Sequence, residues 1–195
     1  MGVDIADFNN DSYLDYIQVD MDAKDNRRSK ANMASMNPDL FWSTVNYGFH
    51  YQYMHNTLQL NRRIQGDKPF FSNISRLSGI SSTDWSWGPL LADLDNDGWK
   101  DLFISNGIRR EINHRDFFND IKLRPMSSDS LLYYTEQMPS EAIANFTFQN
   151  NSDLTFTDVT ESWGLDQKNF SNGATYADLD NDGDLEIIAC KRSGM

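Results

Sequence analysis

Cysteine, long apolar runs and a leader-like N-terminus are rare or missing in this sequence. Cys190 is the single cysteine among 195 residues, so the chain has neither an internal disulfide framework nor a cysteine-rich zinc site. No stretch approaches the roughly 18 consecutive apolar residues of a membrane-spanning helix. The opening MGVDIADFNND has no basic segment and no apolar segment, which excludes a secretory signal there.

Positive charge and glutamate are also scarce. The chain has 17 Lys and Arg against 29 Asp and Glu, for a net charge of −12, and only 5 of the acids are Glu. Such a chain repels phosphate backbones and anionic lipids, which weighs against nucleic acid and membrane surfaces as partners. Aspartate suits turns, caps and metal-binding loops, so its excess directs attention to loops. The 13% aromatic fraction argues against wholesale disorder.

Three segments repeat one another without gaps. They are ADFNNDSYLDYI from Ala6, ADLDNDGWKDLFI from Ala92 and ADLDNDGDLEII from Ala177, and their first aspartates lie 86 and 85 residues apart. Further residues recur at equal distances before the second and third segments: Phe71 and Phe156, Gly79 and Gly164, and Gly88 and Gly173. Self-similarity of this kind indicates a repeat architecture.

The residues around the repeated segments predict strands and two helical inserts. Short apolar runs with β-branched and aromatic residues follow each segment and predict strands. Residues 21–56 and 108–145 lie between the units and contain bunched apolar residues with few turn signals, which favours helix. Ser130 is expected to cap a helix in the second insert, and Pro139 to limit it.

This pattern predicts an all-β fold. We expect a partial β-propeller with two nearly complete four-stranded blades, part of a third, and two helical inserts that leave the array on one side. Because the chain begins and ends inside a unit, we expect a fragment of one longer propeller. The expected segments are the C-terminal part of a blade with the first loop (1–20), a helical insert (21–56), a blade with the second loop (57–107), a second helical insert (108–145) and a blade with the third loop (146–195).

Each Asp-rich loop carries oxygen side chains at positions 1, 3, 5 and 9, counted from its first aspartate. Position 7 varies, as expected if only its backbone carbonyl binds. Hard oxygen donors in a curled loop suit Ca²⁺, which takes about six to eight oxygens. The candidate ligands are Asp7, Asn9, Asp11, Tyr13 and Asp15; Asp93, Asp95, Asp97, Trp99 and Asp101; and Asp178, Asp180, Asp182, Asp184 and Glu186.

Position 6 of the loops is expected to form a sharp turn. It is glycine in two loops, Gly98 and Gly183, where a positive φ costs little. The first loop has Ser12 instead, which should cost about 1 kcal/mol if the same geometry is kept.

Other ions and loop types fit this pattern less well. Magnesium demands tight octahedral geometry and keeps its waters, and zinc prefers His or Cys, which the loops lack. An EF-hand loop requires an acid at position 12, where this chain has Gln18, Ile104 and Ala189. The remaining alternative is an Asp-rich turn that binds nothing. Clustered carboxylates without a cation would repel one another, which favours an ion.

The loop pattern D-x-[DN]-x-D-x-x-x-[DE] between strands resembles the FG-GAP/VCBS repeat of integrin-α-like β-propellers. Longer stretches, including SSTDWSWGPLLADLDNDGWKDLFISNGI and FTDVTESWGL with GATYADLDNDGDLEI, are similar to the cartilage-acidic-protein (ASPIC/UnbV) group of extracellular VCBS-repeat proteins. The resemblance implies a bladed propeller, calcium in each loop and an extracytoplasmic or cell-surface setting. Asn9 and Ser12 depart from the family pattern in the first loop, and Glu186 is a milder change in the third.

Residues outside the loops offer further candidates. His50, His55 and His114 have no accompanying nucleophile motif; an enzyme or enzyme accessory built on the propeller is the alternative, and it would need a pocket joining His114 to an insert carboxylate. Trp85 and Trp87 are expected to pack between blades. The arginine pairs at 27–28 and 109–110 are expected to be solvated charge.

We therefore expect a non-enzymatic calcium-binding scaffold for recognition or adhesion, with up to three structural Ca²⁺ ions, one per loop. The expected partners are calcium ions and a protein or carbohydrate ligand at the inserts, since loops on a rigid scaffold usually carry binding. Nucleic acid and membrane insertion are not expected. The expected setting is extracellular, cell-surface or periplasmic. A cytosolic calcium sensor is a second alternative, which predicts a hydrophobic groove that opens on binding.

Overall fold

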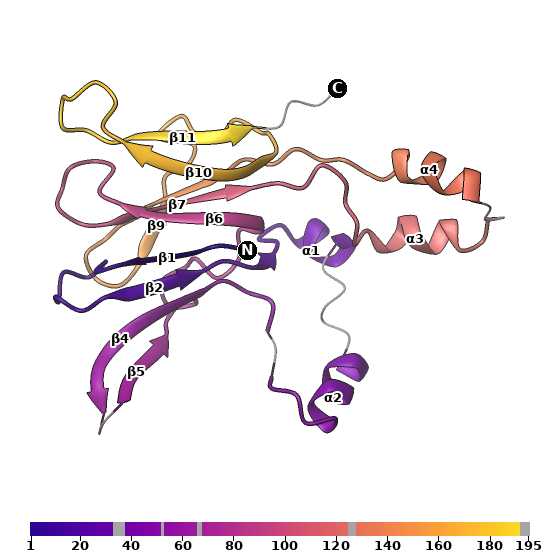
Figure 1. The fold of residues 1–195 in the computed structure, drawn as a ribbon, viewed down its shortest axis with the longest axis horizontal. Coiled ribbons are helices and arrows are strands. Elements are labelled where there is room, and N and C mark those ends of the chain that lie inside the picture. Colours follow the sequence, from indigo (N-terminus) through magenta and orange to yellow (C-terminus); the bar gives the residue numbers. More distant parts are fainter. Residues whose placement is uncertain (33–37, 52, 66–67, 125–127, 192–195) are drawn as a thin grey trace.

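The computed structural model describes residues 1–32, 38–51, 53–65, 68–124 and 128–191 (Figure 1). Strands dominate this part of the chain and form antiparallel sheets, and short helices lie beyond one end of them. The expected β-rich class is confirmed, while the propeller arrangement stays a prediction.

The first sheet contains four antiparallel strands in the order β1-β2-β4-β5. They are β1 (Val3–Ala6), β2 (Asp15–Gln18), β4 (Thr57–Gln65) and β5 (Lys68–Asn73). The first insert separates β2 from β4 in sequence, yet the two strands are neighbours in the sheet. The sheet is therefore a meander that the insert interrupts.

The second sheet contains five strands in the order β3-β6-β7-β8-β9. They are β3 (Met21–Asp22), β6 (Asp84–Ala92), β7 (Asp101–Asn106), β8 (Phe146–Asn150) and β9 (Phe156–Asp158). The second insert separates β7 from β8 in the same way. A further hairpin pairs β10 (Ser171–Ala177) with β11 (Glu186–Lys191).

These sheets divide the chain differently from the expected segments. The segment 57–107 does not form one sheet, because β4 and β5 pair in the first sheet and β6 and β7 in the second. The segment 146–195 is divided likewise between β8–β9 and β10–β11. The reason is that the second strand of each of the first two Asp-rich hairpins pairs onward with the strand beyond the insert: Ile17 pairs with Leu58, and Leu102 pairs with Phe148.

Equivalent residues of the two sheets take equivalent places in the hydrogen-bond ladders. Asn61 pairs with Phe71 in the first sheet, and Asn150 pairs with Phe156 in the second. Gly88 and Gly173 each follow a register shift in their hairpins. The residues that recur in the sequence thus occupy matching structural positions.

A shared apolar core joins the sheets. Its buried members include Ile17 and Leu58 from the first sheet and Leu102 and Phe148 from the second, all 0–2% exposed. The strand β6 lies beside both β1 and β10, so the first strands of the three hairpins are neighbours. At Gly2 an added Cβ would lie 2.5 Å from the Trp87 carbonyl oxygen, which shows how closely β1 approaches β6.

The helices of the described residues all lie in the two inserts. They are α1 (Asn26–Asn32), α2 (Pro38–Asn46), α3 (Arg115–Ile121) and α4 (Ser128–Glu136). Both inserts leave the sheets at the same end, as expected (Figure 1).

Two details of the inserts differ from expectation. The apolar stretch of the first insert does not continue as helix, because α2 ends at Asn46 and Gly48 follows with a φ of 86°. Ser130 is not an N-cap, since α4 begins at Ser128 and includes it.

Arg28 of α1 is buried among three carboxylates. Its Nε and Nη2 donate to both oxygens of Asp84 at 2.6 and 2.9 Å, and its Nη1 donates to Glu111 at 2.6 Å and Glu141 at 3.0 Å. Burial lowers the pKa of Arg28, but its bonds and charge interactions with Asp84 and Glu111 outweigh burial and raise the pKa above its ordinary value. The expectation of solvated charge is therefore wrong for Arg28, because the fold gathers these carboxylates from β6 and the second insert.

The same ion-pair cluster holds a strained residue. Asp84 begins β6 with a φ of 84°, a conformation that is costly for a residue with a side chain. Its side chain is fixed by the two-pronged bond to Arg28. The cluster thus ties both inserts to the start of β6.

Replacing Arg28 with Met should destabilise the fold by about 3–5 kcal/mol, because Asp84 and Glu111 would stay buried without a counter-charge. Urea unfolding measures this loss. Arg27→Met is the matched control, since Arg27 pairs with Glu141 on the exposed surface and should unfold near the wild-type midpoint. Equal losses in the two variants would contradict the assignment.

Candidate metal centre

The three Asp-rich loops are hairpin turns with one register. In each, the residue before position 1 pairs with position 9: Ala6 with Asp15, Ala92 with Asp101, and Ala177 with Glu186. Antiparallel pairing thus returns the position-9 carboxylate to the start of the loop. All three loops lie at the end of the sheets away from the helices (Figure 1).

The position-1 carboxylate holds each turn in shape. The N–H of position 6 donates to it in every loop, from Ser12 to Asp7 at 2.7 Å, from Gly98 to Asp93 at 2.9 Å and from Gly183 to Asp178 at 3.2 Å. The N–H of position 7 donates to the position-5 carboxylate at 2.8–3.0 Å. The three loops therefore have the same pattern of backbone hydrogen bonds to their carboxylates.

Positions 4 and 6 adopt left-handed backbone in every loop. Position 6 has φ values of 70° at Ser12, 90° at Gly98 and 96° at Gly183, which confirms the turn expected there. Position 4 is always asparagine, with φ between 56° and 61°. The sequence reasoning missed this second turn, although Asn is one of the few residues with a side chain that tolerates such a conformation.

The carboxylates at positions 1, 3 and 9 come together in the second and third loops. Each group has oxygens within 4.8 Å of one another and could hold a metal ion: Asp93, Asp95 and Asp101 in one, and Asp178, Asp180 and Glu186 in the other. The position-5 residues Asp97 and Asp182 lie outside these groups and accept the position-7 N–H instead.

The first loop offers an amide in place of the position-3 carboxylate. With its amide assigned by hydrogen bonding, Asn9 Nδ2 donates to Asp7 Oδ1 at 3.0 Å and to Asp11 Oδ1 at 3.3 Å. A cation between these groups would require the amide to turn its oxygen inward.

The position-9 carboxylates of the first two loops are buried. Asp15 and Asp101 are both 0% exposed, and burial raises the pKa of each to about 6. Burial and the charges of Asp11 and Asp7 raise the pKa of Asp15, although the backbone N–H groups of Asn61 and Phe8 lower it. Because a buried carboxylate is costly while it is charged, its position near Asp7 and Asp11 fits a cation site.

Two asparagines outside the loops complete their support and were not among the predicted site residues. The backbone N–H of Asn61 donates to Asp15 at 2.7 Å, and that of Asn150 donates to Asp101 at 2.9 Å. Their side chains donate to the carbonyl at position 8 of the same loops, at 3.1 and 3.0 Å. The segments LQLN, which ends at Asn61, and FTFQN, which ends at Asn150, resemble each other in sequence, but this resemblance does not reveal the role of the two asparagines.

The side chains at position 7 are not grouped with the carboxylates at positions 1, 3 and 9. The Arg63 guanidinium lies 5.0 Å from the centre of the Tyr13 ring, and Asp184 accepts a hydrogen bond from Asn96. Trp99 is half-buried. That the position-7 carbonyls bind a cation stays a prediction.

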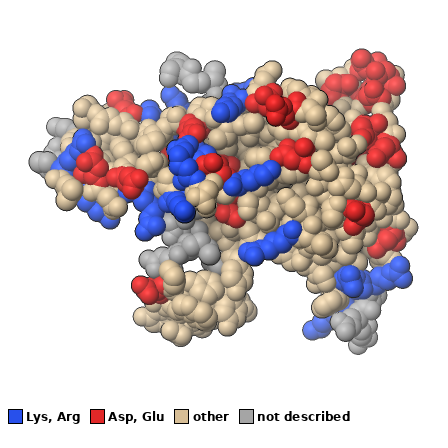
Figure 2. Space-filling model, turned by 180° about the vertical axis from the view of Figure 1, so that it is seen from behind, with Lys and Arg blue, Asp and Glu red and all other residues tan. Residues whose placement is uncertain are grey.

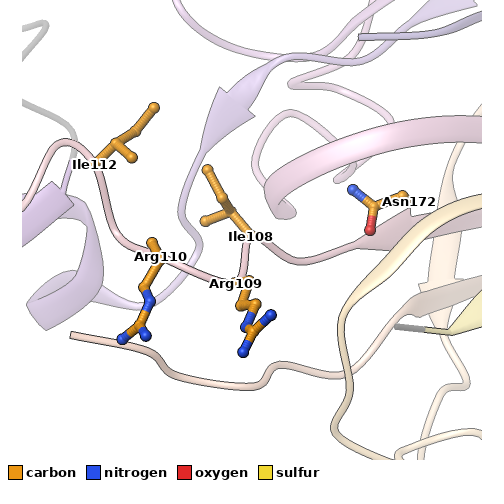
Figure 3. Close-up of a pocket in the computed structure, with 5 residues that line it drawn as sticks. All are labelled: Ile108, Arg109, Arg110, Ile112 and Asn172. Atoms are coloured by element: carbon orange, nitrogen blue, oxygen red, sulfur yellow. The ribbon is translucent and has the colours of Figure 1, made fainter. Parts of the chain in front are cut away.

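His114 has a structural role in the second insert. It is the N-cap of α3, where its Nδ1 accepts the Phe117 N–H at 3.3 Å. Figure 3 shows a pocket of about 410 Å³ lined by Ile108, Arg109, Arg110, Ile112 and Asn172. This pocket does not join His114 to a carboxylate. Arg110 donates to the carbonyl of Glu136, the last residue of α4, and to the carbonyl of Met138 just beyond it, so it supports the end of that helix.

The two tryptophans lie where the inserts meet the second sheet. Trp85 is buried against Ala23, and Met21, Trp87 and Ile108 pack around this pair. The Trp87 Nε1 donates to the Gly107 carbonyl at 2.6 Å. Trp85 and Trp87 thus contact the first residues of the two inserts.

Acidic side chains gather at the end of the molecule that carries the loops, and basic ones are more frequent toward the helices (Figure 2). Within the described residues, none of the helices combines the length and apolar character needed to cross a membrane. Comparison with protein-family models and with curated proteins finds no match to this chain.

Replacing Ser12 with Gly should stabilise the fold by up to about 1 kcal/mol, because relief of a left-handed conformation worth about 1–2 kcal/mol outweighs the added chain entropy. Chemical unfolding in chelator measures the change. Ser72→Gly in β5 is the control and should destabilise by roughly 0.5–1 kcal/mol. A loss of stability in Ser12→Gly would refute the strain at position 6.

The raised pKa values of Asp15 and Asp101 predict a pH dependence. Because the folded, metal-free chain binds these protons more tightly than the unfolded chain, the two carboxyls destabilise it as the pH rises from about 4 through about 6. Protons also compete with a cation for both groups. The gain in melting temperature on adding calcium should therefore shrink between pH 7.5 and pH 5. A gain that is constant or larger at pH 5 would contradict this.

Proposed function

We propose that this chain is a calcium-binding, non-enzymatic part of an extracellular or cell-surface scaffold for recognition or adhesion. The observation that carries the proposal is the convergence of three acidic side chains in the second loop and three in the third, on a hairpin geometry that recurs in the first. In this proposal up to three Ca²⁺ ions bind, one in each hairpin loop.

Calcium suits the donor sets better than other ions. The loops offer carboxylate and amide oxygens, which are hard donors, and no His or Cys. In the second and third loops, positions 1, 3 and 9 supply oxygens that converge. Ca²⁺ accepts an irregular set of about six to eight oxygens, which carbonyls and water can complete. Magnesium requires stricter octahedral geometry.

The role of calcium in this proposal is structural. The loops join adjacent strands of a hairpin, and their position-9 carboxylates sit on the second strand. A cation would neutralise the clustered charge and fasten the start of the loop to that strand. Extracellular modules commonly bind calcium with dissociation constants of about 10⁻⁴–10⁻³ M, and we expect the same range here.

A partial β-propeller of the FG-GAP/VCBS type is the architecture that we propose. Two antiparallel meanders and a further hairpin support it, as does the adjacency of β1, β6 and β10, the first strand of each. First strands side by side are what blades around a common axis require. The likeness to the ASPIC/UnbV group rests on the repeated sequence alone.

An exposed aromatic surface on the first insert supports a role in recognition. Trp42, Tyr47, Phe49 and Tyr51 are 55–83% exposed, and residues 40–61 contain no Lys, Arg, Asp or Glu. Exposed aromatic groups with polar tips are typical of surfaces that bind a partner. We propose that this insert binds a protein or carbohydrate ligand.

Calcium should raise the melting temperature of this chain. With a dissociation constant near 10⁻⁴ M, 10 mM calcium would add about 2.7 kcal/mol per site, or roughly 5–10 °C for a chain of this size. Differential scanning calorimetry in calcium and in chelator measures the shift. An identical melting temperature in both conditions would refute the proposal.

The variant Asp95→Ala with Asp180→Ala should lose most of the gain that the second and third loops contribute, because each change removes the position-3 oxygens. Asp166→Ala is the matched control, since Asp166 is an exposed aspartate outside the loops. If the double variant keeps the full gain, the loops are not the binding sites.

A further inference from the structure

Asparagine at position 4 links each loop to the next. Asn10 Nδ2 of the first loop donates to the Gly98 carbonyl of the second loop at 3.1 Å. Asn96 Nδ2 of the second loop donates to Asp184 Oδ1 of the third loop. Both bonds span 88 residues of sequence, so position 4 reaches the next loop twice, once at a position-6 carbonyl and once at a position-7 carboxylate.

Asn150 makes a second link between the first two loops. Its Nδ2 donates to the Phe8 carbonyl of the first loop at 2.9 Å and to the Lys100 carbonyl of the second at 3.0 Å. Its backbone N–H donates to Asp101 at 2.9 Å. One side chain, 5% exposed, therefore holds the backbone of both loops.

The links made by Asn10 and Asn96 end on residues that themselves hydrogen-bond to candidate ligands. Gly98, whose carbonyl accepts from Asn10, donates its own N–H to Asp93 Oδ2 at 2.9 Å. Asp184, which accepts from Asn96, donates its N–H to Asp182 Oδ1 at 3.0 Å. Ordering the carboxylates of one loop thus also orders the acceptor that the preceding loop uses.

We propose that cation binding in neighbouring loops is positively coupled, with Asn10 and Asn150 joining the first loop to the second and Asn96 joining the second to the third. This rests on the proposed calcium-binding function. A cation bound in the second loop orders that loop and, through these hydrogen bonds, part of the first. A cation that then binds in the first loop loses less free energy to ordering, so it binds more tightly. Coupling of this kind is reciprocal.

Charge acts in the opposite direction. A cation in one loop reduces the negative potential that attracts a cation to its neighbour. At 0.15 M salt this effect is screened beyond about 8 Å, whereas short hydrogen bonds are not. The coupling should therefore be stronger at 0.15 M than at 0.01 M salt.

Terbium luminescence tests the coupling on the whole chain. Tb³⁺ replaces Ca²⁺ at oxygen sites and is excited through a nearby aromatic ring, which position 7 provides as Tyr13 in the first loop and Trp99 in the second. The luminescence that is lost in Tyr13→Phe is assigned to the first loop, and the luminescence that is lost in Trp99→Phe is assigned to the second. The dissociation constant of the first loop is then compared between wild type and Asp95→Ala, which removes the position-3 oxygens of the second loop but leaves Gly98 and Asp101 unchanged.

Disabling the second loop should weaken binding in the first by about fivefold or more. Asn10→Gly should reduce that factor, because glycine keeps the left-handed conformation of position 4 but removes the donor. Asn181→Gly is the matched control: it occupies position 4 of the third loop, where the described residues show no bond to another loop, and it should leave the factor unchanged.

The outcomes separate the two proposals. The coupling is overturned if the dissociation constant of the first loop does not change when the second loop is disabled. It is also overturned if the coupling factor is as large in Asn10→Gly as in wild type. Either result leaves the proposal of calcium binding intact. Absence of Tb³⁺ and Ca²⁺ binding to the wild-type chain overturns the proposed function itself.

Discussion

Antiparallel pairing across each Asp-rich hairpin is the constraint on which the rest of the structure depends. It places position 9 opposite the residue before position 1, so a carboxylate on the second strand returns to the start of the loop. The turns at positions 4 and 6 fit the loop into that span. The next strand, beyond an insert, then adds Asn61 or Asn150 to hold the carboxylate. The turn residues and the arrangement of the candidate cation ligands thus both follow from the pairing register of the hairpin.

Charge is divided between the two ends of the molecule. The inserts at 21–56 and 108–145 contain nine basic and nine acidic residues, so the net charge of −12 belongs to the remainder of the chain. Within the inserts the main interaction is the buried cluster of Arg28, Asp84 and Glu111, which fixes both inserts to β6. At the loop end, no ion pair with a basic side chain is seen for the loop carboxylates among the described residues, which is why a cation is the natural counter-charge there.

The three loops form a series with decreasing burial. Position 2 shows it: Phe8 in the first loop is 0% exposed and packs 5.9 Å from the Phe156 ring, whereas Leu179 in the third is 60% exposed. Burial of the first loop comes from the second sheet, which lies against it. The same contact explains how Asn150 of that sheet reaches the Phe8 carbonyl, and it makes the first loop the most constrained of the three.

The sequence by itself determined the β-rich class, the helical inserts, the turn at position 6 and the oxygen donors of the loops, because these depend on residue type and on local spacing. Tertiary structure alone decided which strands share a sheet: the sequence unit 57–107 is split because pairing continues across the inserts. It also decided that Arg28 is buried and that Asn10 and Asn150 connect loops. Such contacts join residues 56 to 142 positions apart, and no local pattern encodes a partner at that distance.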